Sequence, residues 1–262
     1  MVSGTAVIPH PAKADKGGED ACFATVRDDG AAIIGVADGV GGWAELGVDP
    51  ARFSRLLMFA AEEAMQGRAG LTPADLVKGL HDAWTRAREE TGSSTACVCA
   101  IAPGEAAETF PPARTLTCAN LGDSGFLLIR NGAVVAKSEP QQHNFNFPFQ
   151  LGSDPGSDKP DAADEYEESM QAGDVLVVGT DGLFDNVYDE EIVSIVTETE
   201  KEKPSATQVA EAIAAFASLK ASSQSSQTPF ADAAHRCGLR FEGGKLDDIT
   251  CVCVLTTPAA SP

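Results

Sequence analysis

Three short apolar runs in this chain each end on an aspartate beside a glycine. The runs are residues 32–39 (AIIGVADG), 115–125 (TLTCANLGDSG) and 174–182 (DVLVVGTDG). Each is short, rich in β-branched residues and punctuated by glycine, which is typical of a buried strand. A further acidic pair, Asp247-Asp248, directly precedes the apolar run 249–255. Aspartates therefore recur at the ends of predicted buried strands, where the backbone holds each carboxylate rigidly.

Carboxylates that converge from several strand ends repel one another unless cations lie between them. Aspartates, together with backbone carbonyls and water, are the ligands that hard ions such as Mg²⁺ and Mn²⁺ prefer. The neighbouring glycine lets backbone and ligand approach closely. The pattern predicts a metal site, and we interpret it as a two-metal site. Asp-Gly is also the commonest hairpin turn, and we assign Asp28-Asp29-Gly30 to that class.

The chain is strongly acidic, with a net charge of −20. Nucleic acids and anionic membranes bind basic surfaces, so neither is an expected partner. No apolar stretch approaches the roughly 20 residues that a membrane-spanning helix needs. A phosphate-bearing substrate is repelled at long range unless bound cations reverse the local charge, which is a second reason to expect metal. The seven cysteines are interpreted as reduced, mostly core thiols, because no zinc-ligand spacing is present.

The order of predicted elements indicates an α+β fold with mostly antiparallel sheets covered by helices. Strands are predicted at 21–27, 31–38, 93–102, 115–120, 125–130, 133–137, 174–180 and 249–255, and helices at 50–66, 72–90, 190–200, 205–220 and 228–237. Asp189 is expected to cap the helix that follows it. Residues 138–165 are irregular and too long for a plain connection, which predicts a functional flap. We expect one domain over 1–262, with a core of about 17–255 and a disordered tail from residue 256.

Six segments carry a joint signature: GGEDACF, GVADGVGGW, GSSTA, CANLGDSGFLL, GDVLVVGTDGLFDN and KLDDIT. The residues of these segments and their order along the chain resemble those of the type 2C metal-dependent serine/threonine protein phosphatases, over nearly all of residues 17–254. The closer resemblance is to the branch with DGVGGW, whose members are often mitochondrial or plastid proteins. The reduced cysteines favour an intracellular compartment, and the resemblance implies mitochondria or plastids if the chain follows that branch. Residues 1–16 show no secretory or transit pattern, so any presequence would lie outside this sequence.

The resemblance implies a catalytic role for three aspartates. Asp38 would bridge two metal ions, and Gly39 would offer its backbone carbonyl to the first. Asp181 and Asp247 would bind the second metal. In the pair at 247–248 the first residue matches the family's ligand, so Asp248 is expected outside the direct ligands.

Three further acidic residues take supporting roles by the same resemblance. Glu19 would hold metal-bound water, Asp20 would lie beside it, and Asp123 would bind a third, weaker metal. The implied fold is a central antiparallel β-sandwich flanked by helices on both sides, in four layers. The implied activity is hydrolysis of phosphoserine or phosphothreonine in proteins by a hydroxide that bridges two Mn²⁺ or Mg²⁺ ions. The expected partner is a phosphoprotein substrate, and the expected state is a monomer.

Two departures from the family pattern affect the mechanism. Many members carry a histidine directly after the first Asp-Gly, where this chain has Val40, so the usual general acid is missing. The phosphate-binding arginine before the Glu-Asp pair is also absent. Lys13 or Lys16 is a candidate replacement, as a point charge without a bidentate grip, against the alternative of plain surface lysines. His143 is a candidate substrate contact, with a structural role as the favoured alternative.

These departures motivate two rival hypotheses. In the first, the chain is a catalytically impaired scaffold or regulatory module that keeps the fold. The full set of metal carboxylates argues against it, since such a cluster is costly unless cations bind. In the second, the substrate is a small phosphorylated metabolite rather than a protein.

Overall fold

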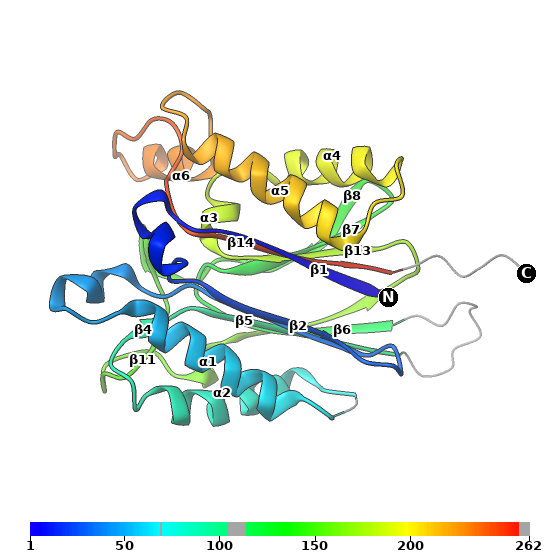
Figure 1. The fold of residues 1–262 in the computed structure, drawn as a ribbon, viewed down its shortest axis with the longest axis horizontal. Helices are drawn as coiled ribbons and strands as arrows, with labels where there is room; N and C mark the ends of the chain where they lie inside the picture. Colours follow the sequence, from blue (N-terminus) through cyan, green and yellow to red (C-terminus); the bar gives the residue numbers. More distant parts are fainter. Residues whose placement is uncertain (69, 104–113, 257–262) are drawn as a thin grey trace, which may run out of the picture.

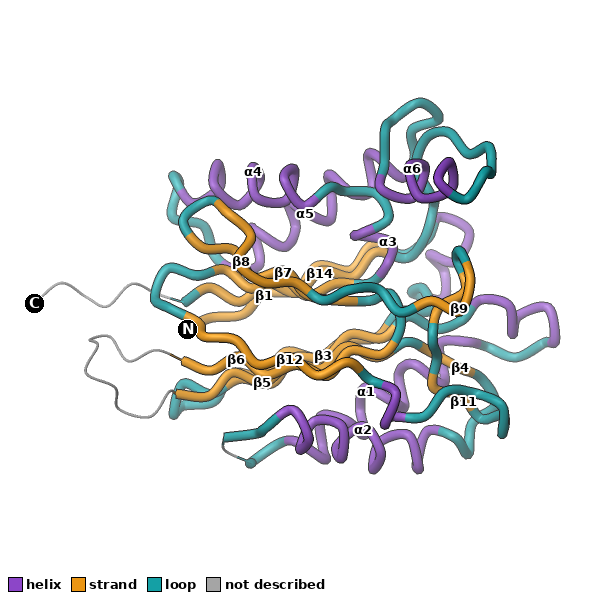
Figure 2. The backbone as a smooth tube through the Cα atoms, turned by 180° about the vertical axis from the view of Figure 1, so that it is seen from behind, coloured by secondary structure: helices purple, strands orange, loops and turns teal. Residues whose placement is uncertain are grey.

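The computed structural model describes residues 1–68, 70–103 and 114–256. Two five-stranded sheets face each other, and helices cover the outer face of each sheet (Figures 1 and 2). All strand pairings within the two sheets are antiparallel. The predicted four-layer α-β-β-α sandwich is therefore confirmed.

The first sheet has the strand order β1-β14-β13-β7-β8. Its strands are β1 (Val2–Ile8), β7 (Gly125–Arg130), β8 (Ala133–Lys137), β13 (Val175–Gly179) and β14 (Ile249–Leu255). The second sheet has the order β12-β6-β5-β3-β2. Its strands are β2 (Ala21–Val26), β3 (Ala32–Ala37), β5 (Ala96–Pro103), β6 (Arg114–Leu121) and β12 (Asp164–Met170).

Short elements and helices complete the described fold. Two small sheets pair β4 (Ser93–Ser94) with β11 (Leu151–Gly152), and β9 (Gln142–Asn144) with β10 (Phe147–Pro148). The α-helices are α1 (Pro50–Met65), α2 (Pro73–Ala87), α3 (Asp181–Phe184), α4 (Asp189–Glu200), α5 (Ala206–Ala221) and α6 (Pro229–Arg236). The 3-10 helices are η1 (Pro11–Lys16), η2 (Gly41–Leu46) and η3 (Pro160–Ala162). No helix in these described segments is long and apolar enough to cross a membrane.

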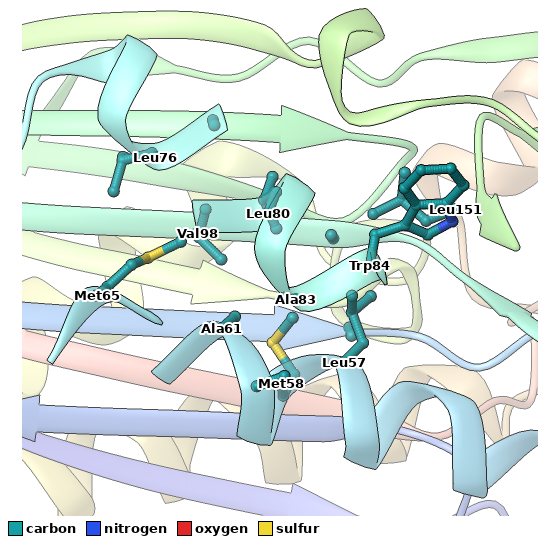
Figure 3. Close-up of a cluster of buried hydrophobic side chains, with 14 of the residues drawn as sticks. Leu57, Met58, Ala61, Met65, Leu76, Leu80, Ala83, Trp84, Val98 and Leu151 are labelled. Atoms are coloured by element: carbon teal, nitrogen blue, oxygen red, sulfur yellow. The ribbon is translucent and has the colours of Figure 1, made fainter. Parts of the chain in front are cut away.

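Three buried apolar layers hold the sandwich together. Helices α1 and α2 pack on the second sheet, and Figure 3 shows Leu57 and Met65 of α1 in one cluster with Leu80 of α2 and Val98 of β5. Helices α4 and α5 pack on the first sheet through a separate cluster. The third cluster fills the space between the sheets. The strand ends are thereby held in fixed positions, which the site requires.

Local signals account for the accurate helix starts. The Asp49 side chain accepts a hydrogen bond from the backbone N–H of Ala51, and Pro50 is the first residue of α1. Thr72 and Asp75 form a reciprocal capping box at the start of α2. Each of these signals lies within a few residues of the helix start, so the amino-acid sequence alone reveals it.

Strand β1 was not predicted, and it places the start of the folded core at residue 2 rather than about 17. It pairs along its whole length with β14, from Val2 opposite Leu255 to Ile8 opposite Ile249. Gly4 weakens the strand pattern, because glycine has a low strand propensity. Its lack of a side chain is needed here, since a Cβ at residue 4 would lie 2.0 Å from the backbone nitrogen of Thr207.

Strand β12 was also missed, because its sequence DEYEESM looks like a polar loop. It pairs only with β6 and forms one edge of the second sheet. Charged residues on an edge strand discourage pairing with other chains. The acidic side chains of this strand form a solvated surface, since Asp164, Glu165 and Glu167 are exposed.

Two smaller expectations need correction. Tyr188, not Asp189, is the cap of α4, and Asp189 is its first helical residue, paired with Lys137 at 3.0 Å. The expected disordered tail does not include Thr256, whose buried hydroxyl donates to the carbonyls of Gln171 and Asp174. Residues 257–262 lie outside the described part of the chain. Five of the seven cysteines are buried, as expected of mostly core thiols, and Cys237 is exposed.

Candidate active site

The predicted acidic residues come from both sheets and meet at one end of the sandwich. Asp38 follows β3, Glu19 and Asp20 precede β2, and Asp123 lies between β6 and β7. From the other sheet, Asp181 follows β13 and Asp247 precedes β14. Burial, and then the charges of Asp181, Asp20, Asp247 and Asp123, raise the pKa of Asp38 well above its usual range. The sequence prediction that these carboxylates converge is thus supported by their mutual electrostatic effect.

Asp20 joins the two sheets at this end. One of its carboxylate oxygens accepts hydrogen bonds from the hydroxyls of Thr180 at 2.8 Å and Thr250 at 2.7 Å. Thr180 directly precedes Asp181, and Thr250 belongs to β14, so the contact fixes strand ends of the first sheet against the start of β2. Burial is the largest cause that raises the pKa of Asp20 to about 8.

The glycines beside two of the aspartates allow close backbone packing. A Cβ on Gly39 would lie 2.7 Å from the backbone oxygen of Glu19, and a Cβ on Gly182 would lie 2.0 Å from that of Asp248. Both distances are too short for any larger residue without movement of the backbone. The Asp-Gly pairs therefore bring the acidic segments of different strands into contact.

Unpartnered carboxylate oxygens make the cluster a candidate cation site. The Oδ1 atoms of Asp20, Asp123 and Asp181 are buried without a hydrogen-bond partner among the described residues. Buried polar atoms are almost always satisfied, so unsatisfied carboxylate oxygens indicate a bound group. Burial, followed by repulsion from Asp181, also raises the pKa of Asp123 to about 7. Hard divalent cations fit this donor set, because they bind carboxylate oxygens and offset the repulsion.

The two candidate lysines differ in position. The Lys13 ammonium lies 2.5 Å from Glu19, 3.3 Å from Asp248 and 4.0 Å from Asp247. Burial lowers the pKa of Lys13, but its hydrogen bond to Glu19 and the nearby carboxylates raise it overall. The side chain of Lys16 is exposed and makes no ion pair among the described residues, and its backbone carbonyl accepts a hydrogen bond from Arg55. The structure therefore brings Lys13, and not Lys16, to the cluster.

Asp247 and Asp248 lie in different surroundings. The Asp248 side chain is 1% exposed and accepts hydrogen bonds from the backbone N–H groups of His10 and Glu19. The Asp247 side chain is 22% exposed and lies near both Lys13 and Lys245. Burial and then repulsion from Asp181 raise the pKa of Asp247. Asp248 thus holds the N-terminal segment in place, and Asp247 keeps its oxygens toward the cluster.

Sequence reasoning missed Lys245 and Asp185. The Lys245 ammonium lies 2.5 Å from Asp181, 2.7 Å from Asp185 and 3.6 Å from Asp247. Both residues lie inside motifs that carry the family resemblance, KLDDIT and GDVLVVGTDGLFDN. The available signal for Lys245 was its place two residues before the acidic pair Asp247-Asp248. The direction in which its side chain points, however, depends on how the preceding loop folds.

Asn186 sets the position of Lys245. Its side-chain amide donates to the carbonyls of Gly182 and Lys245, each at 2.9 Å, and its carbonyl accepts from the backbone N–H of Lys245. Asn186 thereby stabilises the turn after Asp181. The same contacts also fasten the loop before β14 to that turn.

The predicted flap contacts the site through Gln142 rather than His143. The Gln142 amide donates to Asp123 at 3.0 Å. His143 pairs with Asp158 at 3.0 Å and stacks on Phe149 at 4.1 Å between ring centroids. These contacts favour the structural alternative for His143.

Comparison with known proteins places the chain in a family. The family description for stage II sporulation protein E (SpoIIE) matches residues 28–257. The protein phosphatase PTC7 homolog of Homo sapiens is 40% identical over 246 residues, which cover 89% of this chain and 77% of that protein. This chain belongs to the protein phosphatase 2C family. The predicted family is therefore confirmed.

Other members of the phosphatase 2C family extend the match. Probable protein phosphatase 2C 55 of Arabidopsis thaliana is 41% identical over 254 residues, which cover 96% of this chain and 51% of that protein. The chain thus spans about half the length of the plant relatives it matches. A solved structure described as the photosystem II phosphatase PBCP is 32% identical, with a TM-score of 0.80 over 96% of this chain and 97% of that one. The catalytic domain of PstP, solved with two manganese ions, shares the fold at 18% identity and a TM-score of 0.63.

Proposed function

We propose that this chain is a metal-dependent protein phosphatase that hydrolyses phosphoserine and phosphothreonine. The observation that most directly supports this function is the cluster of buried carboxylates with unpartnered oxygens at one end of a phosphatase 2C sandwich. The PTC7 homologues and the photosystem II phosphatase support a phosphoprotein substrate, because those names describe protein phosphatases.

The acidic residues would hold two divalent cations, Mn²⁺ or Mg²⁺. Asp38 and the Gly39 carbonyl would serve the first, and Asp181 and Asp247 the second, with Asp123 available for a third ion. Glu19 and Asp20 would support the first site. When bound, such cations acidify water into a nucleophile and offset charge on the phosphoryl oxygens.

The chain's own residues orient the substrate. Lys13 places a fixed positive charge beside the cluster, where it would attract a phosphoryl oxygen in place of the absent arginine. Val40 has no proton to give, so water or another group must protonate the departing serine or threonine oxygen. Buried carboxylates around the cluster repel any phosphate that arrives without a cation in place, which couples turnover to metal.

We also propose a monomer that functions inside cells, in mitochondria or plastids. The proposal rests on the resemblance to members of those compartments and on the net charge of −20, which disfavours self-association by like-charge repulsion. Light scattering on the eluting protein tests the monomer. Imaging of the tagged protein in its source cells tests the location.

The test of function is hydrolysis of para-nitrophenyl phosphate and of a phosphothreonine peptide, with Mn²⁺, with Mg²⁺ and with excess EDTA. Asp38→Asn and Asp181→Asn should each lower kcat by at least ~100-fold, because each removes charge that holds cations. Asp82→Asn, an exposed residue of α2, is the matched control and should keep full turnover. Full activity of either site variant, or undiminished activity in EDTA, contradicts the proposal. Turnover of phosphosugars but of no phosphopeptide indicates a metabolite phosphatase instead.

A further inference from the structure

A groove of about 500 Å³ continues from the acidic cluster across the surface. Asp123 and Asp185 line its inner end, and Asp185 contacts Lys245 of the cluster at 2.7 Å. Its walls come from four segments of the chain: residues 123–127, residues 137–145, the α3–α4 turn at 184–190, and α6. The groove is therefore contiguous with the centre at which a phosphorylated residue would react.

Aromatic side chains line part of this groove. Phe145, Phe184 and Phe230 all contribute to its wall. The rings of Phe145 and Phe230 lie 5.1 Å apart between centroids, and Phe230 meets Phe241 edge-on at 4.8 Å. The Lys245 ammonium lies 5.1 Å from the centre of the Phe230 ring. The wall is thus packed from behind and fixed to the cluster, while Phe145 and Phe184 remain partly exposed.

Acidic side chains dominate the outer rim of the groove. The rim contains four acidic residues and two basic ones: Glu139, Asp189, Glu190, Asp232, Lys137 and Arg236. Lys137 is already neutralised by Asp189 at 3.0 Å. The carboxylates of Glu139 and Glu190 are exposed and have no ion pair among the described residues. An apolar wall with a negatively charged rim complements a peptide in which an apolar residue lies near a lysine or arginine.

We propose that this groove binds the stretch of a substrate protein that flanks the phosphorylated residue, and selects an apolar side chain together with a lysine or arginine. The proposal rests on the proposed phosphatase function. The aromatic wall would remove the apolar side chain from water, which is the main favourable term in such contacts. The unpaired rim carboxylates would attract the basic side chain and repel acidic flanking residues.

Charge also argues against other occupants. Nucleic acids and anionic membranes are repelled by the negative rim and by the net charge of the chain. A second copy of the same chain carries the same charge of −20 and is disfavoured for the same reason. A basic, partly apolar peptide segment is the partner that both features favour.

The experiment measures kcat/KM of the Mn²⁺-loaded protein on a series of phosphothreonine peptides. One flanking position is changed at a time, over five positions on each side, to leucine, serine, lysine or glutamate. On one side of the phosphothreonine, at the position that reaches the aromatic wall, the peptide with leucine should have a kcat/KM about tenfold higher than the peptide with serine. At a position farther out on that side, the peptide with lysine should have a kcat/KM about tenfold higher than the peptide with glutamate at low salt. The lysine preference should shrink as salt increases.

Two variants with matched controls locate the selectivity. Glu139→Lys/Glu190→Lys should reduce the lysine-to-glutamate ratio to about one or invert it, while Glu202→Lys/Glu211→Lys makes the same charge change at exposed sites away from the groove. Phe145→Ala should reduce the leucine-to-serine ratio, while Phe59→Ala removes an exposed ring of α1. Each readout is a ratio for one enzyme, so it does not depend on the fraction of protein that is folded.

Each outcome is decisive. Position-specific preferences that the groove variants remove and the control variants keep support the proposal. Equal kcat/KM on all peptides, a preference for acidic flanking residues, or ratios unchanged by the groove variants overturn it. If wild-type protein hydrolyses para-nitrophenyl phosphate with Mn²⁺ but has the same kcat/KM on all peptides, only the proposal about the groove is contradicted. If the protein shows no metal-dependent turnover on any substrate, the proposed phosphatase function itself is contradicted.

Discussion

At the residue scale, the main physical fact is the cost of the buried carboxylates. Burial raises the pKa of Asp20 and of Asp185 to about 8 each, and both lie near Asp181. Such groups destabilise a fold when ionised and unpartnered. The chain places the ammonium groups of Lys13 and Lys245 among them, which reduces the repulsion without satisfying every oxygen. The unsatisfied oxygens are what divalent cations would complete.

The two candidate lysines provide a matched pair of substitutions. Lys13→Met should lower kcat/KM on phosphopeptides by about tenfold or more, because it removes a charge that we place beside the phosphoryl group. Lys16→Met should change kcat/KM by less than about twofold, because its side chain is exposed and away from the cluster. Steady-state kinetics with Mn²⁺ measures both. Equal losses in the two variants would contradict the assignment of Lys13.

At the element scale, strand ends and the turns that follow them build the site. β3 and β13 stop at Asp-Gly pairs, and glycine lets the segments after them pack against backbone from other strands. Asn186 then ties the turn after β13 to the loop before β14. These turns position carboxylates that no single strand brings together.

Asn186→Ala tests this link. The side chain is fully buried and makes three hydrogen bonds to backbone groups, so its removal should lower the free energy of unfolding by ~2 kcal/mol or more. The same change should weaken Mn²⁺ binding, since Lys245 and the adjoining Asp247 lose their support. Urea unfolding and calorimetry measure the two effects. Thr117→Val, at a buried hydroxyl of β6 that bonds the carbonyls of Leu71 and Ala100, is the control and should lower stability without changing metal affinity. Unchanged Mn²⁺ affinity in Asn186→Ala would show that the loop keeps its place without Asn186.

At the scale of the whole molecule, the site lies where the two sheets meet. One sheet supplies Asp38 and the Glu19-Asp20 pair, and the other supplies Asp181 and Asp247. A cation held between these residues would therefore join the two halves of the sandwich. Metal binding and global stability are expected to be coupled for this reason.

Metal removal should consequently lower the melting temperature. Mn²⁺ at about 100 times its Kd should raise the melting temperature by about 5 to 10 °C over protein in EDTA. In EDTA the melting temperature should also fall as pH rises from about 5 to about 8. The folded pKa of Asp20 (about 8) and of Asp123 (about 7) lies above the ordinary value, so the folded state binds more protons in that interval and loses stability as they leave. Mn²⁺ should reduce this slope. Scanning calorimetry at several pH values measures both, and a melting temperature in EDTA that rises with pH would contradict the carboxylate account.

Features that depend on a few neighbouring residues were determined by the amino-acid sequence itself. The Thr72–Asp75 capping box starts α2, and Asn131-Gly132, with positive φ at both residues, closes the β7–β8 hairpin. The aspartates at strand ends, and through them the expectation of a metal site, follow from the same local patterns.

Features that depend on distant segments were decided only by the tertiary structure. β1 and β12 have weak strand patterns and are strands because β14 and β6 pair with them. The choice of Lys13 over Lys16, the place of Lys245 and the aromatic groove all require segments that are far apart in the chain to meet. The physical reason is that caps and turns are short-range, whereas edge pairing, buried charge and grooves arise from packing that no local pattern encodes.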